Sequence, residues 1–153
     1  MSIIDAVLIQ AELFNDISAK IIPGKARRVE KQSYPGSSLR EAVLNAFCHA
    51  DFSRPSNIIL KFSAKEVAIT SPGSLYKITL EEMLQGAQTY RNPNLIKVLN
   101  RLGYIENFGR GIERIIDAYE NETRRQSFLA CENFFKVILP NLNYNVTKGV
   151  VTE

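Results

Sequence analysis

The chain has 153 residues, of which 45% are hydrophobic and 23% charged, with a formal net charge of +3. This length fits one domain with a sizeable core, and the composition is ordinary for a soluble globular protein. The positive charges are scattered, which does not indicate a nucleic-acid-binding face. One His and two Cys are too few for a zinc site. The sequence shows no apolar leader and no membrane-length segment, so we expect a cytoplasmic protein without membrane contact.

The first part of the chain is predicted to contain one amphipathic helix, over residues 3–18. Its apolar residues recur at helical spacing: Ile4, Val7, Leu8, Ala11 and Phe14. Pro23 and Gly24 indicate a turn after this helix. Residues 26–32 mix Val29 with charged residues and are expected to form an edge strand.

A second helix is predicted over residues 39–51, and the rest of the chain is organised around it. Apolar residues cover most of its circumference, and His49 is the only residue between Glu41 and Asp51 in the sequence that can carry a charge. Glu41, Asn45 and His49 are four residues apart and form a narrow polar line along one side. A helix with one face in water usually carries several charged residues on that face. We therefore expect a buried helix whose polar line faces a pocket.

Strand and helix signals follow one another through the rest of the chain. They predict a hairpin of residues 58–62 and 67–70 that ends at Ser71–Ser74, followed by a short helix capped by Thr79 and a polar loop over residues 85–92. Two further helices are predicted, one from Pro93 to Gly103 and one from Ile112 to about Asn121. The last predicted element is a strand over residues 134–139 that is closed by Pro140.

This order of elements predicts an α+β fold. We expect a two-layer α/β sandwich whose mostly antiparallel sheet carries helices on one face. The expected domain spans residues 1–140, of which residues 1–25 are an N-terminal helix and lead-in. Residues 141–153 lose hydrophobic density and are predicted to be a tail or a linker to a further domain.

The polar line and two later glycines suit phosphate and metal chemistry. The amide oxygen of Asn45 is a hard ligand of the kind that Mg²⁺ prefers. The carboxylate of Glu41, one turn earlier, could orient or deprotonate a water molecule. Gly109 and Gly111 precede a predicted helix, whose N-terminal amides and dipole favour an anion.

Each of these residues also has a purely structural interpretation. Ser38 to Glu41 matches a capping box, in which Glu41 only closes the start of the helix. Asn45 could be a buried amide with satisfied hydrogen bonds, and His49 a packed or helix-ending histidine. Asp51 could hold the following turn. A Gly-x-Gly before a helix is common in turns that have no ligand, and Arg91 in the predicted 85–92 loop could simply be a surface residue.

Between about residues 30 and 140, eight short motifs occur in order: Tyr34-Pro35, Leu39-Arg40-Glu41-Ala42, Asn45-Ala46, His49-Ala50-Asp51, Ser71-Pro72-Gly73, Arg91-Asn92-Pro93, Gly103-Tyr104-Ile105-Glu106 and Gly109-Arg110-Gly111-Ile112. This set resembles the GHKL ATP-binding superfamily, which includes the gyrase B subunit, the ninety-kilodalton heat-shock chaperone, histidine kinases and MutL. More closely, it is similar to the ATP-binding domain of bacterial transcriptional regulators that are labelled as related to the helicase RecG.

The resemblance implies a Bergerat-type α/β sandwich that holds ATP between its sheet and its helices. It places Glu41 at the general-base position and Asn45 at the magnesium position, and it places residues 85–92 at the nucleotide lid. Pro72 and Gly73 would border the adenine, and residues 109–111 would lie near the phosphates. The candidate catalytic residue is thus Glu41, the candidate Mg²⁺ ligand is Asn45, and the candidate cofactor-binding residues are Asn45, His49, Asp51, Ser71, Pro72, Gly73, Arg91, Gly109, Arg110 and Gly111.

Two functions remain open at this point. The first is an ATP-binding regulatory module of a transcriptional-regulator-like protein, with Mg-ATP on the central helix and at most weak hydrolysis. The second is a degenerate GHKL-fold module for protein interaction or dimerisation without nucleotide. It is favoured by Ser71, where the superfamily carries an adenine-reading Asp, and by the single Gly-x-Gly.

The chain lacks a Gly-x-x-x-x-Gly-Lys-Ser/Thr loop, which excludes a helicase motor. Expected partners are a nucleotide and, as an option, a second copy of the chain. DNA is expected only through domains outside it.

Overall fold

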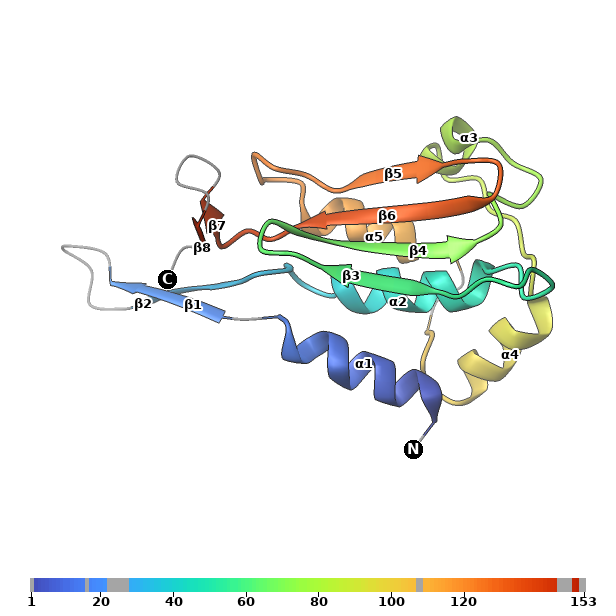
Figure 1. Ribbon diagram of the computed structural model, residues 1–153, viewed down its shortest axis with the longest axis horizontal. Coiled ribbons are helices and arrows are strands. Elements are labelled where there is room, and N and C mark those ends of the chain that lie inside the picture. The colour runs from blue at the N-terminus through green and yellow to red at the C-terminus, as the bar shows by residue number, and fades with distance from the viewer. Residues whose placement is uncertain (1, 16, 22–27, 107–108, 146–149, 152–153) are drawn as a thin grey trace.

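The computed structural model describes residues 2–15, 17–21, 28–106, 109–145 and 150–151 (Figure 1). The helices are α1 (Ile3–Leu13), α2 (Ser38–His49), α3 (Leu80–Leu84), α4 (Pro93–Arg101) and α5 (Gly111–Ala118). The strands are β1 (Ile17–Ile21), β2 (Arg28–Gln32), β3 (Ile59–Phe62), β4 (Glu66–Pro72), β5 (Ser127–Ala130), β6 (Phe134–Pro140), β7 (Tyr144–Asn145) and β8 (Val150–Val151). No helix in these ranges is both long enough and apolar enough to cross a bilayer.

The central sheet has four strands in the order β3-β4-β6-β5, and each neighbouring pair is antiparallel. Helices α2 and α5 pack against each other, and both lie on the same side of this sheet (Figure 1). The two-layer α+β fold with an antiparallel sheet and helices on one face is therefore confirmed. The β1–β2 and β7–β8 pairs form separate two-stranded sheets.

The core lies between the central sheet and these helices. Val67 and Ile69 of β4 pair in register with Leu139 and Val137 of β6, and all four side chains are at most 2% exposed. Half-buried residues alternate with them, as expected for a sheet with one covered face. The same cluster includes residues of α2 and α5 and the residue directly after α5: Leu39, Ala42, Val43, Ala46, Ile115 and Tyr119. Since burial of each large apolar side chain contributes about 1.5–3 kcal/mol, this contact holds α2 firmly on the sheet.

Several predicted elements are confirmed at their ends as well as in their type. Helix α4 begins at Pro93, and Gly103 just beyond it has a φ of +84°. Thr79 and Glu82 form a capping box at the start of α3. The predicted hairpin is formed by β3 and β4, although β4 continues through Pro72.

Two helices are shorter than the sequence pattern predicts. Helix α1 ends at Leu13 instead of continuing to residue 18. The reason is Asn15, whose side chain accepts a hydrogen bond from the backbone N–H of Tyr34 (2.9 Å) and donates one to its carbonyl (3.2 Å). These bonds draw the chain away from the helix axis. Helix α5 ends at Ala118, three residues before the predicted Asn121, and a turn follows.

Other segments differ in kind from the prediction. The predicted edge strand is β2, but it pairs with the unpredicted β1 and lies outside the central sheet. Strand β5 was also not predicted. The turn expected at Pro23–Gly24 lies outside the described residues.

The chain after Pro140 begins with buried contacts. The side chain of Asn141 donates to the Ala64 carbonyl (3.1 Å), and that of Asn143 donates to the Lys31 carbonyl (3.0 Å). Both side chains are nearly inaccessible to water. The first residues of the predicted tail are thus fastened to the loop before β4 and to the end of β2.

Candidate functional site

A cavity of about 460 Å³ opens beside the polar line of α2. Its volume lies within the range of about 300–1,000 Å³ that is common for small-molecule sites. One wall is α2, the opposite wall is the chain between β4 and α4, and the start of α5 closes one end. The lining residues are Glu41, Leu44, Asn45, Cys48, His49, Ser71, Ser74, Leu75, Tyr76, Ile78, Met83 to Tyr90, Ile105, Gly109, Gly111, Ile112, Glu113, Ile116 and Phe135.

All three residues of the polar line contribute to this lining. Glu41, Asn45 and His49 are each partly exposed, whereas seven of the other nine residues of α2 are buried and only Arg40 and Phe47 are partly exposed. The arrangement follows from the sequence, because apolar residues fill every face of the helix that contacts the core. The role of each polar residue stays a prediction, whereas its position in the cavity wall is a feature of the structure.

Glu41 is held by an arginine from the neighbouring helix. Its Oε1 accepts a hydrogen bond from Arg114 Nη1 at 2.8 Å, and the two form an ion pair. The residue that precedes the helix is Ser37, which makes no side-chain capping bond. The capping-box interpretation of Ser38 and Glu41 is therefore wrong, because the carboxylate points to α5 instead of back to the helix start.

Gly111 allows α5 to begin close to this carboxylate. A Cβ added at Gly111 would lie 3.2 Å from Oε2 of Glu41, so a larger residue would push the two apart. The first N–H groups of a helix have no acceptor within the helix. Gly111, Ile112 and Glu113 line the cavity, so this end of α5 presents to an anion N–H groups that have no acceptor within the helix, together with its positive dipole end.

Asn45 makes no side-chain hydrogen bond to any other residue in the described part of the chain. It lies midway along the polar line, with its amide in the cavity wall. An amide that is half-buried and unpaired within the protein can bind a ligand or an ordered ion without first breaking a bond. Among the described residues, no cluster of three or more His, Cys, Asp or Glu side chains could hold a metal by itself. A divalent ion at Asn45 would need further oxygen ligands from a bound molecule.

The two ionisable residues at the end of α2 are both held in their neutral forms. Burial, and to a lesser extent the Arg91 guanidinium, lower the pKa of His49 below its ordinary value of 6.5. Burial, with a smaller effect of the Glu41 charge, raises the pKa of Cys48 to about 12. Neutral imidazole and thiol groups at this end of the cavity suit an uncharged portion of a ligand.

The wall formed by the 85–90 segment meets the glycine turn before α5. Nε2 of Gln88 donates to the carbonyl of Gly109, and Tyr90 donates to Oε1 of Gln88 at 2.9 Å. Gly109 has a φ of +72°, and a Cβ added there would collide with Gln88. Sequence reasoning singled out Gly109 but missed Gln88 as its partner.

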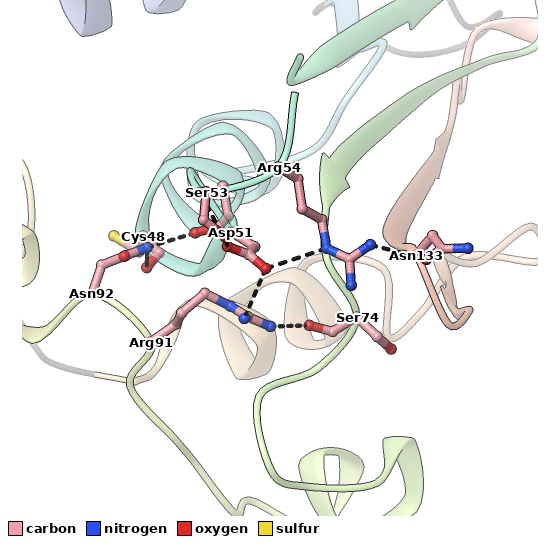
Figure 2. A network of polar contacts seen from close by, with 9 residues as sticks. Cys48, Asp51, Ser53, Arg54, Ser74, Arg91, Asn92 and Asn133 are labelled. Atoms are coloured by element: carbon pink, nitrogen blue, oxygen red, sulfur yellow. Dashed lines mark hydrogen bonds and ion pairs between the residues drawn. The ribbon is translucent and has the colours of Figure 1, made fainter. Parts of the chain in front are cut away.

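A second group of predicted residues lies beside the cavity and not in its lining. Asp51 forms ion pairs with Arg54 (3.2 Å) and Arg91 (3.5 Å), and Nη2 of Arg91 donates to the Ser74 carbonyl at 2.8 Å (Figure 2). Hydrogen bonds from Ser53 and Arg54, together with the charge of Arg91, hold the pKa of Asp51 below its usual range. These contacts favour a structural role for both Asp51 and Arg91.

Gly73 and Asn92 complete this network. Gly73 has a φ of +81°, and a Cβ added to it would lie 2.7 Å from the Cβ of Asp51. The side chain of Asn92 donates to the carbonyls of Cys48 (3.0 Å) and Ala50 (2.8 Å), which satisfies the end of α2 (Figure 2). Pro72 and Arg110 also lie outside the cavity lining. Arg110 instead forms an exposed ion pair at 3.4 Å with Glu113 of α5.

Comparison with known proteins gives one family and one fold. Residues 56–139, more than half of the chain, match the family model HATPase_c_4, described as "Putative ATP-dependent DNA helicase recG C-terminal". The matched segment begins after α2, so it includes the sheet, Ser71 and the start of α5 but not the polar line. No curated protein matches the sequence.

A solved structure shares the fold. The crystal structure of the DIP2311 protein from Corynebacterium diphtheriae superimposes with a TM-score of 0.78 over 90% of this chain, at 21% sequence identity. The match covers 28% of that protein, so the chain spans little more than a quarter of its length. At this identity the likeness is one of fold alone.

We predict that Gly73→Ala destabilises the fold more than Gly86→Ala. Both glycines have a strongly positive φ, but only the added methyl at residue 73 meets another side chain, that of Asp51. We expect a loss of about 2–4 kcal/mol in the free energy of unfolding for Gly73→Ala and about 1–2 kcal/mol for Gly86→Ala. Urea denaturation would measure both, and equal losses would contradict the close packing of Gly73 on Asp51.

We predict that acidification destabilises the wild type more than His49→Gln. The folded protein resists protonation of His49, whereas the unfolded chain takes up the proton near its ordinary pKa of 6.5. Between that pH and the lower pKa of the folded state, the unfolded chain binds more protons, so the free energy of unfolding falls as the pH is lowered. Denaturation at pH 7.5 and pH 5 would measure the change. His49 is the only histidine, so parallel losses in both proteins would exclude its contribution.

Proposed function

The chain belongs to the family of RecG C-terminal-like, ATPase-like domains, and on this basis we propose that its cavity binds Mg-ATP. The observation that carries the proposal is that Glu41, Asn45 and the start of α5 line the same cavity. A carboxylate, an unpaired amide and a helix N-terminus are the groups that water, Mg²⁺ and phosphate each require.

The proposed orientation follows from the chemistry of the two ends of the cavity. The phosphates would lie at Gly109 and Gly111, at the N-terminal end of α5, where backbone N–H groups and the helix dipole favour an anion. Mg²⁺ would contact Asn45 and take its remaining ligands from phosphate oxygens and water, as this ion usually does. The base would lie toward the neutral His49 and Ser71, among the apolar residues of the wall. Asp51, Gly73 and Arg91 would then hold the shape of this end and not contact the nucleotide.

Hydrolysis would proceed slowly and would depend on Glu41. The carboxylate lies on the phosphate side of the cavity and could orient an attacking water. Its ion pair with Arg114 fixes the direction of the carboxylate. We propose that the module serves a regulatory role in a longer, transcriptional-regulator-like protein, as the family resemblance of its motifs implies; the solved structure that shares its fold is a longer chain, of which this chain spans 28%. Contact with DNA would then belong to other parts of such a protein.

Two observations favour a second candidate, an interaction module that binds no nucleotide. The carboxylate of Glu41 is already engaged by Arg114, and Ser71 provides only a hydroxyl where a base would be recognised. In that case the cavity would be a nucleotide site that has lost its function, and the module would act through self-association or through a protein partner. The titration described next separates the two candidates.

We predict that Asn45→Ala weakens Mg-ATP binding at least tenfold. Groups around a bound metal commonly contribute about 10- to 100-fold to its affinity, and Asn45 is the proposed direct ligand. Isothermal titration with ATP and Mg²⁺ would measure the loss, and circular dichroism would verify the fold. Asn100→Ala, on α4 and outside the cavity, is the matched control and should bind like the wild type. A wild type that binds no Mg-ATP at millimolar concentration would favour the interaction module.

We predict that Glu41→Gln abolishes phosphate release without abolishing binding. A general base typically contributes about 10²–10⁴-fold to a rate, so we expect a fall of at least 100-fold in the turnover of saturated protein. Phosphate release at saturating Mg-ATP would measure it. Glu120→Gln removes an exposed carboxylate beyond α5 and controls for the loss of charge. Equal rates in the wild type and the Glu41 variant would remove Glu41 from the mechanism.

A further inference from the structure

The charge of the cavity wall is unusual for a site that would hold a polyanion. Two carboxylates, those of Glu41 and Glu113, belong to the lining. Within the described residues, no Lys or Arg lines the cavity. A triphosphate brought to the start of α5 would therefore meet negative side chains before any positive one.

Each of these carboxylates is paired with an arginine that stands outside the cavity. Glu41 pairs with Arg114 at 2.8 Å, and Glu113 pairs with Arg110 at 3.4 Å. The two pairs differ in their exposure to water. The side chains of Glu41 and Arg114 are 15% and 36% exposed, whereas those of Glu113 and Arg110 are 59% and 58% exposed. Water screens the second pair strongly, so the first pair matters most for the field inside the cavity.

The second carboxylate oxygen of Glu41 faces the start of α5. A Cβ added at Gly111 would lie 3.2 Å from Oε2, so the carboxylate reaches the first residue of that helix. Without a counter-charge, this carboxylate would be attracted to the positive helix end that the phosphates would use. It would also repel the phosphates directly, because like charges in a partly buried site are poorly screened.

We propose that Arg114 sets the affinity of the cavity for the triphosphate group by neutralising Glu41 from outside the cavity. This inference rests on the proposed function, since it places phosphates at the start of α5. Arg114 acts as a positioning residue: it holds the carboxylate toward itself, and the pair presents little net charge to the ligand. The arginine itself does not contact the phosphates.

The test removes the two charges in turn and measures the affinity of each variant. Isothermal titration of the whole chain with Mg-ATP, and separately with inorganic triphosphate and Mg²⁺, would be carried out on the wild type, Arg114→Gln and the double variant Glu41→Gln/Arg114→Gln. We expect Arg114→Gln to raise both dissociation constants about tenfold, because an uncompensated like charge opposes binding. We expect the double variant to return to within about threefold of the wild type, since the offending carboxylate is gone.

Two variants control for fold and for general charge. Arg114→Lys keeps the positive charge and should bind like the wild type. Arg101→Gln removes an exposed arginine at the end of α4 and should change neither dissociation constant. Thermal unfolding by circular dichroism would show that each variant is folded at the temperature of the titration, so that a loss of affinity is not a loss of structure.

The outcomes separate this inference from the proposed function. Unchanged binding by Arg114→Gln would overturn the inference. A double variant as weak as Arg114→Gln would also overturn it, because Arg114 would then contact the phosphates directly. A wild type that binds triphosphate but not ATP would overturn the proposed function, while the triphosphate series would still decide the role of Arg114. A wild type that binds neither probe would overturn both.

Discussion

Helix α2 contacts α1, α5, β4 and β6, and its packing determines where the polar groups of the protein can lie. Leu39, Val43 and Ala46 are each at most 3% exposed, so their burial fixes the rotation of the helix about its axis. A rotation by one residue, about 100°, would move polar side chains into the apolar core without hydrogen-bond partners. Glu41 and Asn45 therefore face the cavity because the faces of α2 that contact the core are occupied by buried apolar residues.

The opposite wall of the cavity is fixed at its two ends by a single arginine. Arg91 donates to the carbonyl of Ser74, so the chain that leaves β4 is tied to the chain that enters α4. Asn92 then binds the carbonyls at the end of α2, and Asp51 N–H donates to the Pro72 carbonyl at 2.9 Å. The segment between these anchors, which includes α3, forms a loop whose residues line the cavity. The network of Figure 2 thus determines the shape of the site, although only Cys48 and Ser74 of its labelled residues line the cavity.

Elements with a strong local pattern could be predicted from the sequence, and elements that depend on distant partners could not. The apolar periodicity of α2, the alternation in β4 and the Pro and Gly at the ends of α4 are all local signals. Strand β5 is an edge strand in which exposed and half-exposed residues alternate, so its sequence carries little hydrophobic contrast. Its pairing with β6 decides its conformation. Similarly, the Ser38–Glu41 pattern predicts a cap, but a stronger charged partner on α5 takes the carboxylate.

The candidate site divides in the same way. The polar line could be predicted because its residues share one helix, whereas Arg114 is 73 residues away from Glu41 and no local pattern joins the two. Residues that belong to neighbouring motifs also separate in space: His49 lines the cavity, and Asp51, two residues later, belongs to the adjoining network. The two clusters are still coupled, because Arg91 helps to keep His49 neutral while it pairs with Asp51. A change that removes the positive charge of Arg91 would therefore alter the cavity electrostatically without removing any residue from its lining.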